Sequence, residues 1–199
     1  MRTHALNFGV AAAALLAVSA CNQGDKSGNG AAPAQTSEAK EAAGDKTIAA
    51  GLPADGKFMA AAKAAGLDQT LAGPGPYTVL VPDDAALASA PDGAFDAKPE
   101  NRAALTGTIT NMILPGTVLA ADIDKAIDAG KGKAVLATMG GGTITATKEG
   151  GKTVLADSSG HKASISKADD QFSNGVVHHV DALLMPSQQA KAAEQKPQG

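Results

Sequence analysis

The sequence predicts an α+β fold: a single domain with helices in its first half packed on an antiparallel β-rich wedge or sandwich. Apolar residues recur at helical spacing in several segments between residues 57 and 130. After residue 130, short runs rich in β-forming residues alternate with turns that contain glycine. Helices followed by hairpin-linked strands are typical of α+β domains. No internal repeat is present, so one domain is expected.

Two helices and a strand are expected at the start of the folded region. Residues 57–67 are predicted to be helical, with Gly66 near the C-terminal cap. Residues 73–82 are expected to turn and then form a short strand that ends at a proline. Asp83 is the predicted N-cap of a helix over residues 83–90, where its carboxylate would accept the first free backbone amides.

Two further helices are expected before the chain becomes strand-like. One begins at Pro99 and stops before Pro115, with apolar residues at helical spacing. The other covers residues 121–130 and has Asp122 as its candidate cap. The predicted strands that follow are KAVLATM, TITATK, KTVLA, ASIS and GVVHHVDALLM.

The two ends of the chain differ in composition from residues 47–187, which are expected to fold. Residues 1–20 are predicted to be a lipoprotein signal peptide, because a weakly basic start precedes an apolar run and then small residues. That run is shorter than the roughly 20 residues needed to span a bilayer. Residues 21–46 and 188–199 lack large apolar side chains, so a disordered tether and a disordered tail are predicted.

Cys21 is the only cysteine, which excludes an intrachain disulfide. Val18, Ser19 and Ala20 precede it in an arrangement that resembles a bacterial lipobox. This resemblance implies a diacylglyceryl group on the Cys21 thiol and anchoring to a membrane. Asn22 favours sorting to the outer membrane. Ordinary secretion with a free thiol, or a buried structural cysteine, are the alternatives.

Composition and missing motifs argue against several classes of function. The chain has 17 Lys and Arg against 20 Asp and Glu, and only 3% of its residues are aromatic, so nucleic-acid binding is not expected. The stretches EGGKT and MGGGT lack the remaining glycines of phosphate-binding and dinucleotide-binding loops. No G-x-S-x-G motif is present. We therefore predict no cofactor, no catalytic residue and no enzymatic activity.

Two ordered motifs resemble the fasciclin (FAS1) domain. The stretch YTVLVPDDAAL (77–87) is similar to the family's FTVFAPTNDAF, and NGVVHHVDALLMP (174–186) is similar to NGVIHVIDxVLLP. Between them, ILPGTVLAADI is similar to VVPGKVTSADL. The resemblance covers roughly residues 48–186, and it implies the FAS1 fold and a role in adhesion. The family positions are Thr78, Val79, Pro82, Asp83 and Asp84 in the first motif, and Asn174, Gly175, His178 and Asp181 in the second.

The sequence departs from the family pattern at two places. Asn111 and Met112 replace a Tyr-His pair that is associated with integrin-type adhesion, so that binding mode is not implied. His179 stands where the family usually has valine.

The adjacent histidines are the most obvious candidates for chemistry. Successive side chains of a strand point to opposite faces, so His178 and His179 are not expected to bind one metal ion together. We predict a buried, hydrogen-bonded structural role for His178, and a position near solvent for His179. A zinc site that adds His161 to one of them stays an alternative, although no ligand spacing supports it.

Two pairs of neighbouring carboxylates are a second candidate for chemistry. Asp83 and Asp84, like Asp169 and Asp170, are expected to cap a helix or to lie in a solvated loop. A catalytic carboxylate pair formed by residues distant in sequence stays open.

Together these observations predict a lipid-anchored protein of the bacterial cell envelope. Its FAS1 domain would bind an unknown protein or extracellular polymer through weak contacts that depend on avidity. The alternative is a periplasmic lipoprotein that binds a small ligand or hydrolyses a substrate in a cleft around the two motifs.

Overall fold

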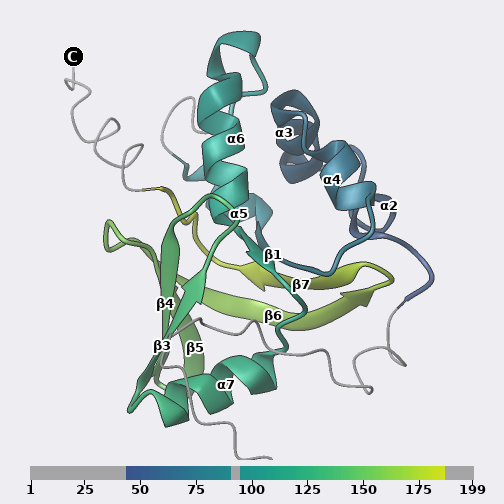
Figure 1. Ribbon diagram of the computed structural model, residues 1–199. Helices are drawn as coiled ribbons and strands as arrows, with labels where there is room; N and C mark the ends of the chain where they lie inside the picture. The colour runs from purple at the N-terminus through teal and green to yellow at the C-terminus, as the bar shows by residue number, and fades with distance from the viewer. Residues whose placement is uncertain (1–43, 91–94, 187–199) are drawn as a thin grey trace, which may run out of the picture. The chain divides into compact units, whose positions relative to one another are not determined.

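A computed structural model describes residues 44–90 and 95–186, and it confirms the α+β fold (Figure 1). The predicted signal peptide, Cys21 and the predicted tail lie outside the described residues, as does most of the predicted tether. Among the residues described, no helix is both long and apolar enough to cross a bilayer.

The described helices precede most of the strands in the chain. They are α2 (Ile48–Gly51), α3 (Lys57–Ala65), α4 (Asp68–Ala72), α5 (Asp84–Ala88), the 3-10 helix η1 (Pro99–Asn101), α6 (Arg102–Asn111) and α7 (Ala120–Ala129). The strands are β1 (Tyr77–Pro82), β2 (Ile113–Pro115), β3 (Lys133–Ala137), β4 (Thr143–Glu149), β5 (Lys152–Ala156), β6 (Lys162–Phe172) and β7 (Gly175–Val180).

The strands form one seven-stranded sheet in the order β2-β1-β7-β6-β5-β4-β3. All neighbouring strands are antiparallel except β1 and β7, which are parallel. The sheet is therefore mixed, whereas the sequence predicted an antiparallel one. The parallel pair is possible because about 90 residues separate β1 from β7, far more than the dozen or so that a parallel crossover needs.

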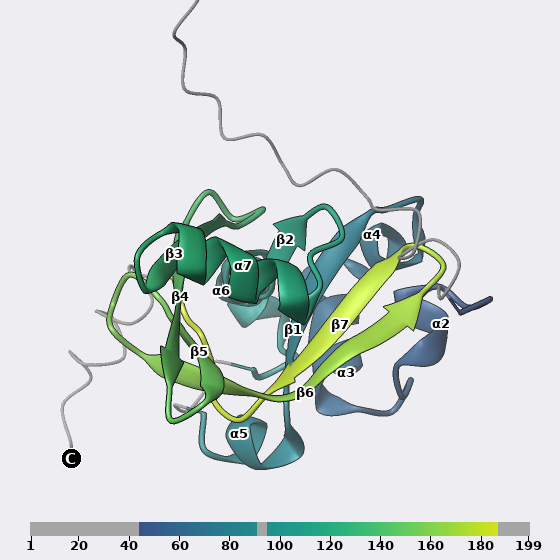
Figure 2. The same ribbon diagram turned by 90° about the horizontal axis from the view of Figure 1, so that it is seen from below.

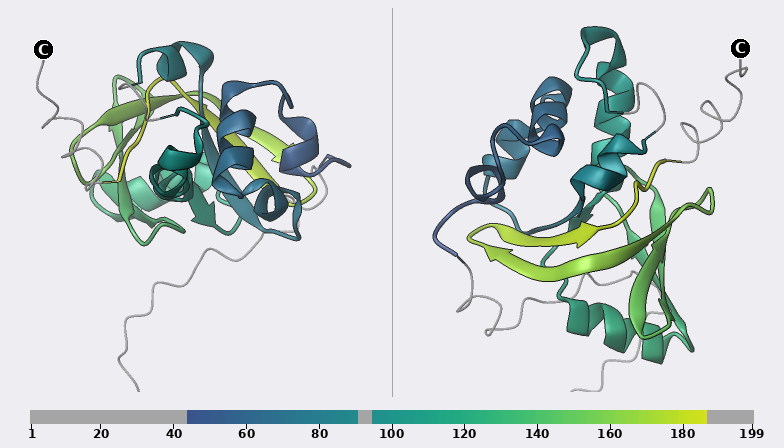
Figure 3. Two further views of the ribbon diagram at one scale, coloured as in Figure 1. Left: turned by 90° about the horizontal axis from the view of Figure 1, so that it is seen from above. Right: turned by 180° about the vertical axis from the view of Figure 1, so that it is seen from behind.

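Helices cover both sides of the sheet. Helices α3, α4 and α6 lie on one side of the β1, β7 and β6 ribbon, and α7 lies on the other (Figures 1 and 3). Helix α7 packs against β3 and β4 and buries Ile123 and Ile127. The core side chains with no more than 2% exposure include Ile48, Leu71, Leu80, Leu105, Ile109, Ile113, Leu114, Ile144 and Leu155.

The helix predicted to stop before Pro115 ends earlier, at Asn111. The Leu80 amide donates to the Met112 carbonyl at 2.9 Å, and Ile113 then pairs with Val79 of β1. Pairing with β1 thus draws Met112 and Ile113 out of the helix, although their spacing fits one. The C-terminal cap of α3 is confirmed: Gly66 has a left-handed conformation, with φ of 78°.

The predicted N-cap position of Asp83 is confirmed, but its predicted capping bond is wrong, because its side chain makes no capping hydrogen bond to α5. The predicted cap at Asp122 is wrong, because Leu119 is the N-cap residue of α7. Asp122 is the third residue of α7, and it accepts a 3.4 Å hydrogen bond from the Leu119 amide. The Asp83 carboxylate instead accepts a hydrogen bond from the Ser166 hydroxyl and lies close to the His179 imidazole, both from the sheet.

Candidate functional site

The two sequence motifs lie side by side in the sheet as strands β1 and β7 (Figure 2). Their register runs from Tyr77 opposite Gly175 to Pro82 opposite Val180. Polar side chains occupy the start, the middle and the end of this strand pair, and each set has different partners.

At the start of β7, Asn174 joins the strand to two helices. Its Oδ1 atom accepts a hydrogen bond from the Ile48 amide of α2 at 2.8 Å. Its Nδ2 atom donates to the carbonyls of Leu71 and Gly73, also at 2.8 Å. Asn174 is 7% exposed, so these bonds satisfy backbone groups that water hardly reaches. Its role is structural.

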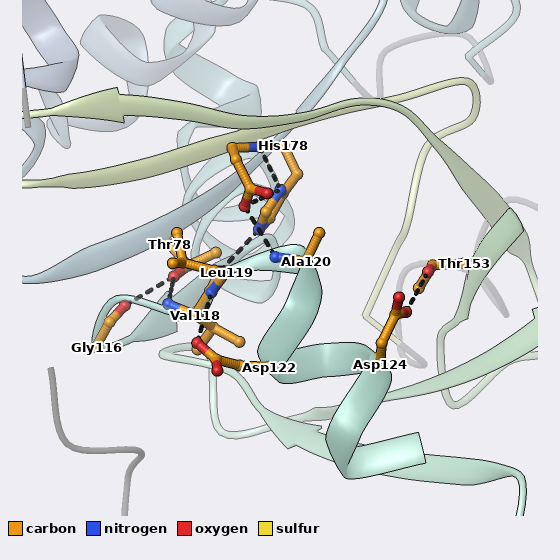
Figure 4. A network of polar contacts seen from close by, with 10 residues as sticks. Thr78, Gly116, Val118, Leu119, Ala120, Asp122, Asp124, Thr153 and His178 are labelled. Atoms are coloured by element: carbon orange, nitrogen blue, oxygen red, sulfur yellow. Dashed lines mark hydrogen bonds and ion pairs between the residues drawn. The ribbon is translucent and has the colours of Figure 1, made fainter. Parts of the chain in front are cut away.

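In the middle of the strand pair, His178 is fully buried (Figure 4). Its Nδ1 atom accepts a hydrogen bond from the Asp169 amide at 3.2 Å, and its Nε2 atom lies 2.8 Å from the Val118 carbonyl. Since Nδ1 is an acceptor, the ring carries its proton on Nε2 and donates it to Val118. Both ring nitrogens are thus engaged by the backbone, which leaves neither free for a substrate.

Val118 links Thr78 to His178 in this network (Figure 4). Its hydroxyl donates to the Gly116 carbonyl and accepts from the Val118 amide, both at 2.8 Å. The Asp169 carboxylate accepts a further hydrogen bond from the Ala120 amide, at the start of α7. Thr78, His178 and Asp169 therefore fix the loop that leads into α7.

Burial lowers the pKa of His178 below its ordinary value of 6.5. The hydrogen bond to Val118 and the charge of Asp169 oppose this effect but do not cancel it. Desolvation disfavours the charged imidazolium, so the folded protein holds His178 neutral.

The lowered pKa of His178 predicts a loss of stability on mild acidification. The unfolded chain takes up the proton first as the pH falls through about 6.5, so protonation favours unfolding. Between pH 7.5 and 5.5, the free energy of unfolding should therefore fall because of this group. Urea unfolding of wild type and His178→Gln at both pH values checks this: the variant should be less stable and lack this part of the pH dependence.

His179→Gln is the matched control, because it removes an imidazole from the opposite face of the same strand. It should keep the pH dependence that His178 causes. An unchanged pH dependence in His178→Gln would contradict a neutral, buried His178.

At the end of the strand pair, His179 lies between two carboxylates. Its Nδ1 atom is 3.8 Å from an Asp83 oxygen, and its Nε2 atom is 3.7 Å from an Asp170 oxygen. Ser166 donates to the other Asp83 oxygen at 2.8 Å, and Lys167 pairs with Asp170 at 3.2 Å. The His179 side chain is 24% exposed.

Asp169 and Asp170 lie on strand β6 rather than in the predicted loop. The Asp169 carboxylate does accept the first amide of α7, although it reaches that amide from the sheet. The register of β6 against β7 shifts between Lys167 and Asp170, and Asp169 has a positive φ of 58°. This bulge turns Asp169 towards His178 and Asp170 towards His179.

Beside His179, a groove of about 180 Å³ opens where β1 meets α5. We call it the β1–α5 groove. Its apolar lining consists of Leu52, Pro53, Phe58, Met59, Val81, Pro82 and Leu87, and its polar lining includes Lys57, Asp83, Asp84 and His179. A cleft around the two motifs was the sequence-based alternative, and Val81, Asp83 and His179 of those motifs line this groove. Residues 52–59 were not expected there, because they reach the groove only through the fold.

The remaining predicted site residues have clear positions. Val79 is fully buried in the core. Asp181 accepts a 2.6 Å hydrogen bond from the Ser164 amide. His161, the alternative zinc ligand, contacts Asp157 at 3.0 Å. Within residues 44–90 and 95–186, no group of three His, Cys, Asp or Glu side chains is placed to hold a metal ion.

Sequence reasoning missed Asp157. Its side chain is 1% exposed and accepts hydrogen bonds from the amides of Ser159, His161 and Met185. The turn DSSG gave a local signal, since an aspartate often accepts from the amide two residues later. The bond to Met185 comes from the fold alone.

Comparison with known proteins identifies the family. The Fasciclin domain family matches residues 56–186. The chain belongs to the fasciclin domain family. Protein sll1483 of Synechocystis sp. is 31% identical over 141 residues, which are 70% of this chain and 71% of that protein. Fasciclin domains are adhesion-type modules.

A solved structure shows the same fold. The FAS1 domain pair of the insect cell adhesion molecule fasciclin I matches with a TM-score of 0.60 and 17% identity. The match covers 72% of this chain and 52% of the domain pair, so this chain spans about half of its length. At that identity the likeness establishes the fasciclin fold alone.

The residues that depart from the family's Tyr-His pair are buried in this fasciclin domain. Asn111 is 4% exposed and Met112 is fully buried. The Asn111 Oδ1 atom accepts a 3.3 Å hydrogen bond from the Thr138 hydroxyl. These two side chains therefore present no surface to a partner.

Proposed function

We propose that this chain is a lipid-anchored protein of a bacterial cell envelope, with the outer membrane favoured. Its fasciclin domain acts as an adhesion module that binds a protein or an extracellular polymer. Membership of the fasciclin family carries this proposal, because fasciclin domains are adhesion-type modules. The lipobox-like residues that precede Cys21 support the anchor.

The geometry of the motif residues favours adhesion over hydrolysis. A general base needs a ring nitrogen or a carboxylate within reach of the substrate. His178 has both nitrogens bonded to the backbone. His179 lies 3.8 Å from Asp83 and 3.7 Å from Asp170, and the sequence has no G-x-S-x-G serine that it could activate. The motifs thus support the fold rather than a reaction.

The anchor is tested by Cys21→Ala. Without the thiol no diacylglycerol can be attached, so the variant should move from the membrane fraction to the soluble fraction and lose labelling by a fatty-acid probe. Cys21→Ser serves as a polar control and should behave in the same way. A membrane-bound Cys21→Ala would contradict the lipid anchor.

The adhesion role is tested by deleting the gene from its native host. The deletion strain should lose cell aggregation or attachment to a surface, and expression of the wild-type chain from a plasmid should restore it. Multivalent display on the envelope makes weak contacts effective, so the loss should be large at the cell level even if each contact is weak. Attachment equal to that of wild-type cells would contradict an adhesion role.

A further inference from the structure

The β1–α5 groove combines an apolar floor with charged side chains at its edge. Leu52, Phe58 and Val81 line the groove and are each no more than 7% exposed. The volume of the groove, about 180 Å³, is below that of typical small-molecule sites. A single side chain of a partner is therefore a better fit than a large ligand.

The charges around the groove favour a cation. Of the described lining residues, Asp83 and Asp84 are acidic and Lys57 is basic, and the imidazole of His179 lies beside Asp83. Asp170 adds a further carboxylate next to His179, although Lys167 pairs with it. Carboxylates therefore outnumber amines among the lining residues, and a cationic group gains from meeting them.

The two aspartates differ in what they offer a partner. Asp83 already accepts a hydrogen bond from Ser166 through one oxygen, and its other oxygen faces His179. It does not present two free oxygens to the planar fork of an arginine. Asp84 is exposed at the first turn of α5, where it can meet a compact ammonium group.

We propose that the β1–α5 groove binds the side chain of a lysine on a partner protein. The four-carbon stem lies on Leu52, Phe58 and Val81, and the ammonium group meets Asp83 and Asp84. Lysine side chains combine an apolar stem with a terminal charge, which matches a groove with an apolar floor and an acidic edge. This inference deepens the proposed function and rests on it for the partner being a protein.

Peptide titration of the purified full chain tests the proposal. The probe is acetyl-glycyl-lysyl-glycine amide, followed by backbone amide NMR shifts of the groove residues. The matched peptide has norleucine in place of lysine, which keeps the stem and removes the ammonium. The lysyl peptide should bind saturably, with a dissociation constant on the order of 1 mM, and the norleucyl peptide should bind about fivefold more weakly.

Charge-matched variants locate the site. Asp84→Asn should weaken the lysyl peptide about threefold, and the double variant Asp83→Asn with Asp84→Asn about fivefold, the same loss as removing the ammonium. Asp128→Asn is the control, because Asp128 is exposed on α7 and the change in net charge is the same as in Asp84→Asn. It should bind as wild type does. Raising the salt concentration should weaken the wild-type interaction towards that of the double variant.

Three results would overturn the proposal: no saturable shifts at groove residues, equal binding of the lysyl and norleucyl peptides, or a double variant that binds like Asp128→Asn while its amide spectrum shows it folded. If the double variant does not fold, two measurements still test the proposal: lysyl-peptide binding by Asp84→Asn, and the comparison of the lysyl and norleucyl peptides on the wild type. Because binding is measured on purified protein, its failure is distinguishable from a failure of the attachment test in cells.

Discussion

Gly175→Ala is expected to destabilise the protein by about 3 kcal/mol. Gly175 begins β7 directly opposite Tyr77 of β1, and its φ is 154°. A Cβ atom at this position would overlap the Tyr77 carbonyl, which is backbone and cannot rotate away. The strands would have to separate where the two motifs first pair. Urea unfolding of the full chain measures the loss, which is a large part of a typical domain's 5–15 kcal/mol.

Gly160→Ala is the matched control for this prediction. Gly160 also has a positive φ, of 90°, but a Cβ atom there would meet no other atom within 4 Å. Its cost should be only the backbone strain, about 1 kcal/mol. Equal losses in the two variants would contradict the close approach of β1 and β7 at Gly175.

Asn174→Ala is expected to cost about 3 kcal/mol, because it removes three hydrogen bonds at once. The Ile48 amide and the Leu71 carbonyl would lose their partner in a buried setting, and each unsatisfied group costs about 1–3 kcal/mol. The loss of stability should be greatest in the elements that Asn174 contacts. Amide exchange should accelerate in α2 and α4, which Asn174 ties to the sheet, and should change less in α7.

Two variants separate the contributions to this effect. Asn174→Asp keeps an acceptor for the Ile48 amide but points a carboxylate at two carbonyls, so it should be at least as unstable as Asn174→Ala. Asn101→Ala removes an asparagine side chain that makes no capping hydrogen bond to α6, and its effect should be below about 0.5 kcal/mol. An Asn174→Ala variant as stable as Asn101→Ala would contradict the structural role of Asn174.

Sequence patterns predicted the α+β class and the positions of most strands because these depend on local periodicity. The strand at residues 175–180 and the left-handed Gly66 are examples of such local signals. The parallel pairing of β1 with β7 was not predicted, because about 90 residues lie between the two segments and no local pattern links them.

The parts of the site that were missed depend on tertiary contacts. Asp83 directly precedes a helix, which is where a capping residue is expected, yet its carboxylate contacts Ser166 and His179 of the sheet. Ile113 fits the apolar face of a helix, yet it pairs with Val79 in β2. The bulge in β6, which brings Asp169 and Asp170 to the two histidines, has no sequence signal that we recognised.

We propose that this fasciclin domain acts in adhesion through Asp83 and Asp84 at the β1–α5 groove. The most direct test measures surface attachment of the deletion strain after expression of variant chains at equal levels in the envelope. Wild type and Asp128→Asn should restore attachment, and the double variant Asp83→Asn with Asp84→Asn should not. Full restoration by the double variant, or normal attachment of the deletion strain itself, would contradict an adhesion role for Asp83 and Asp84.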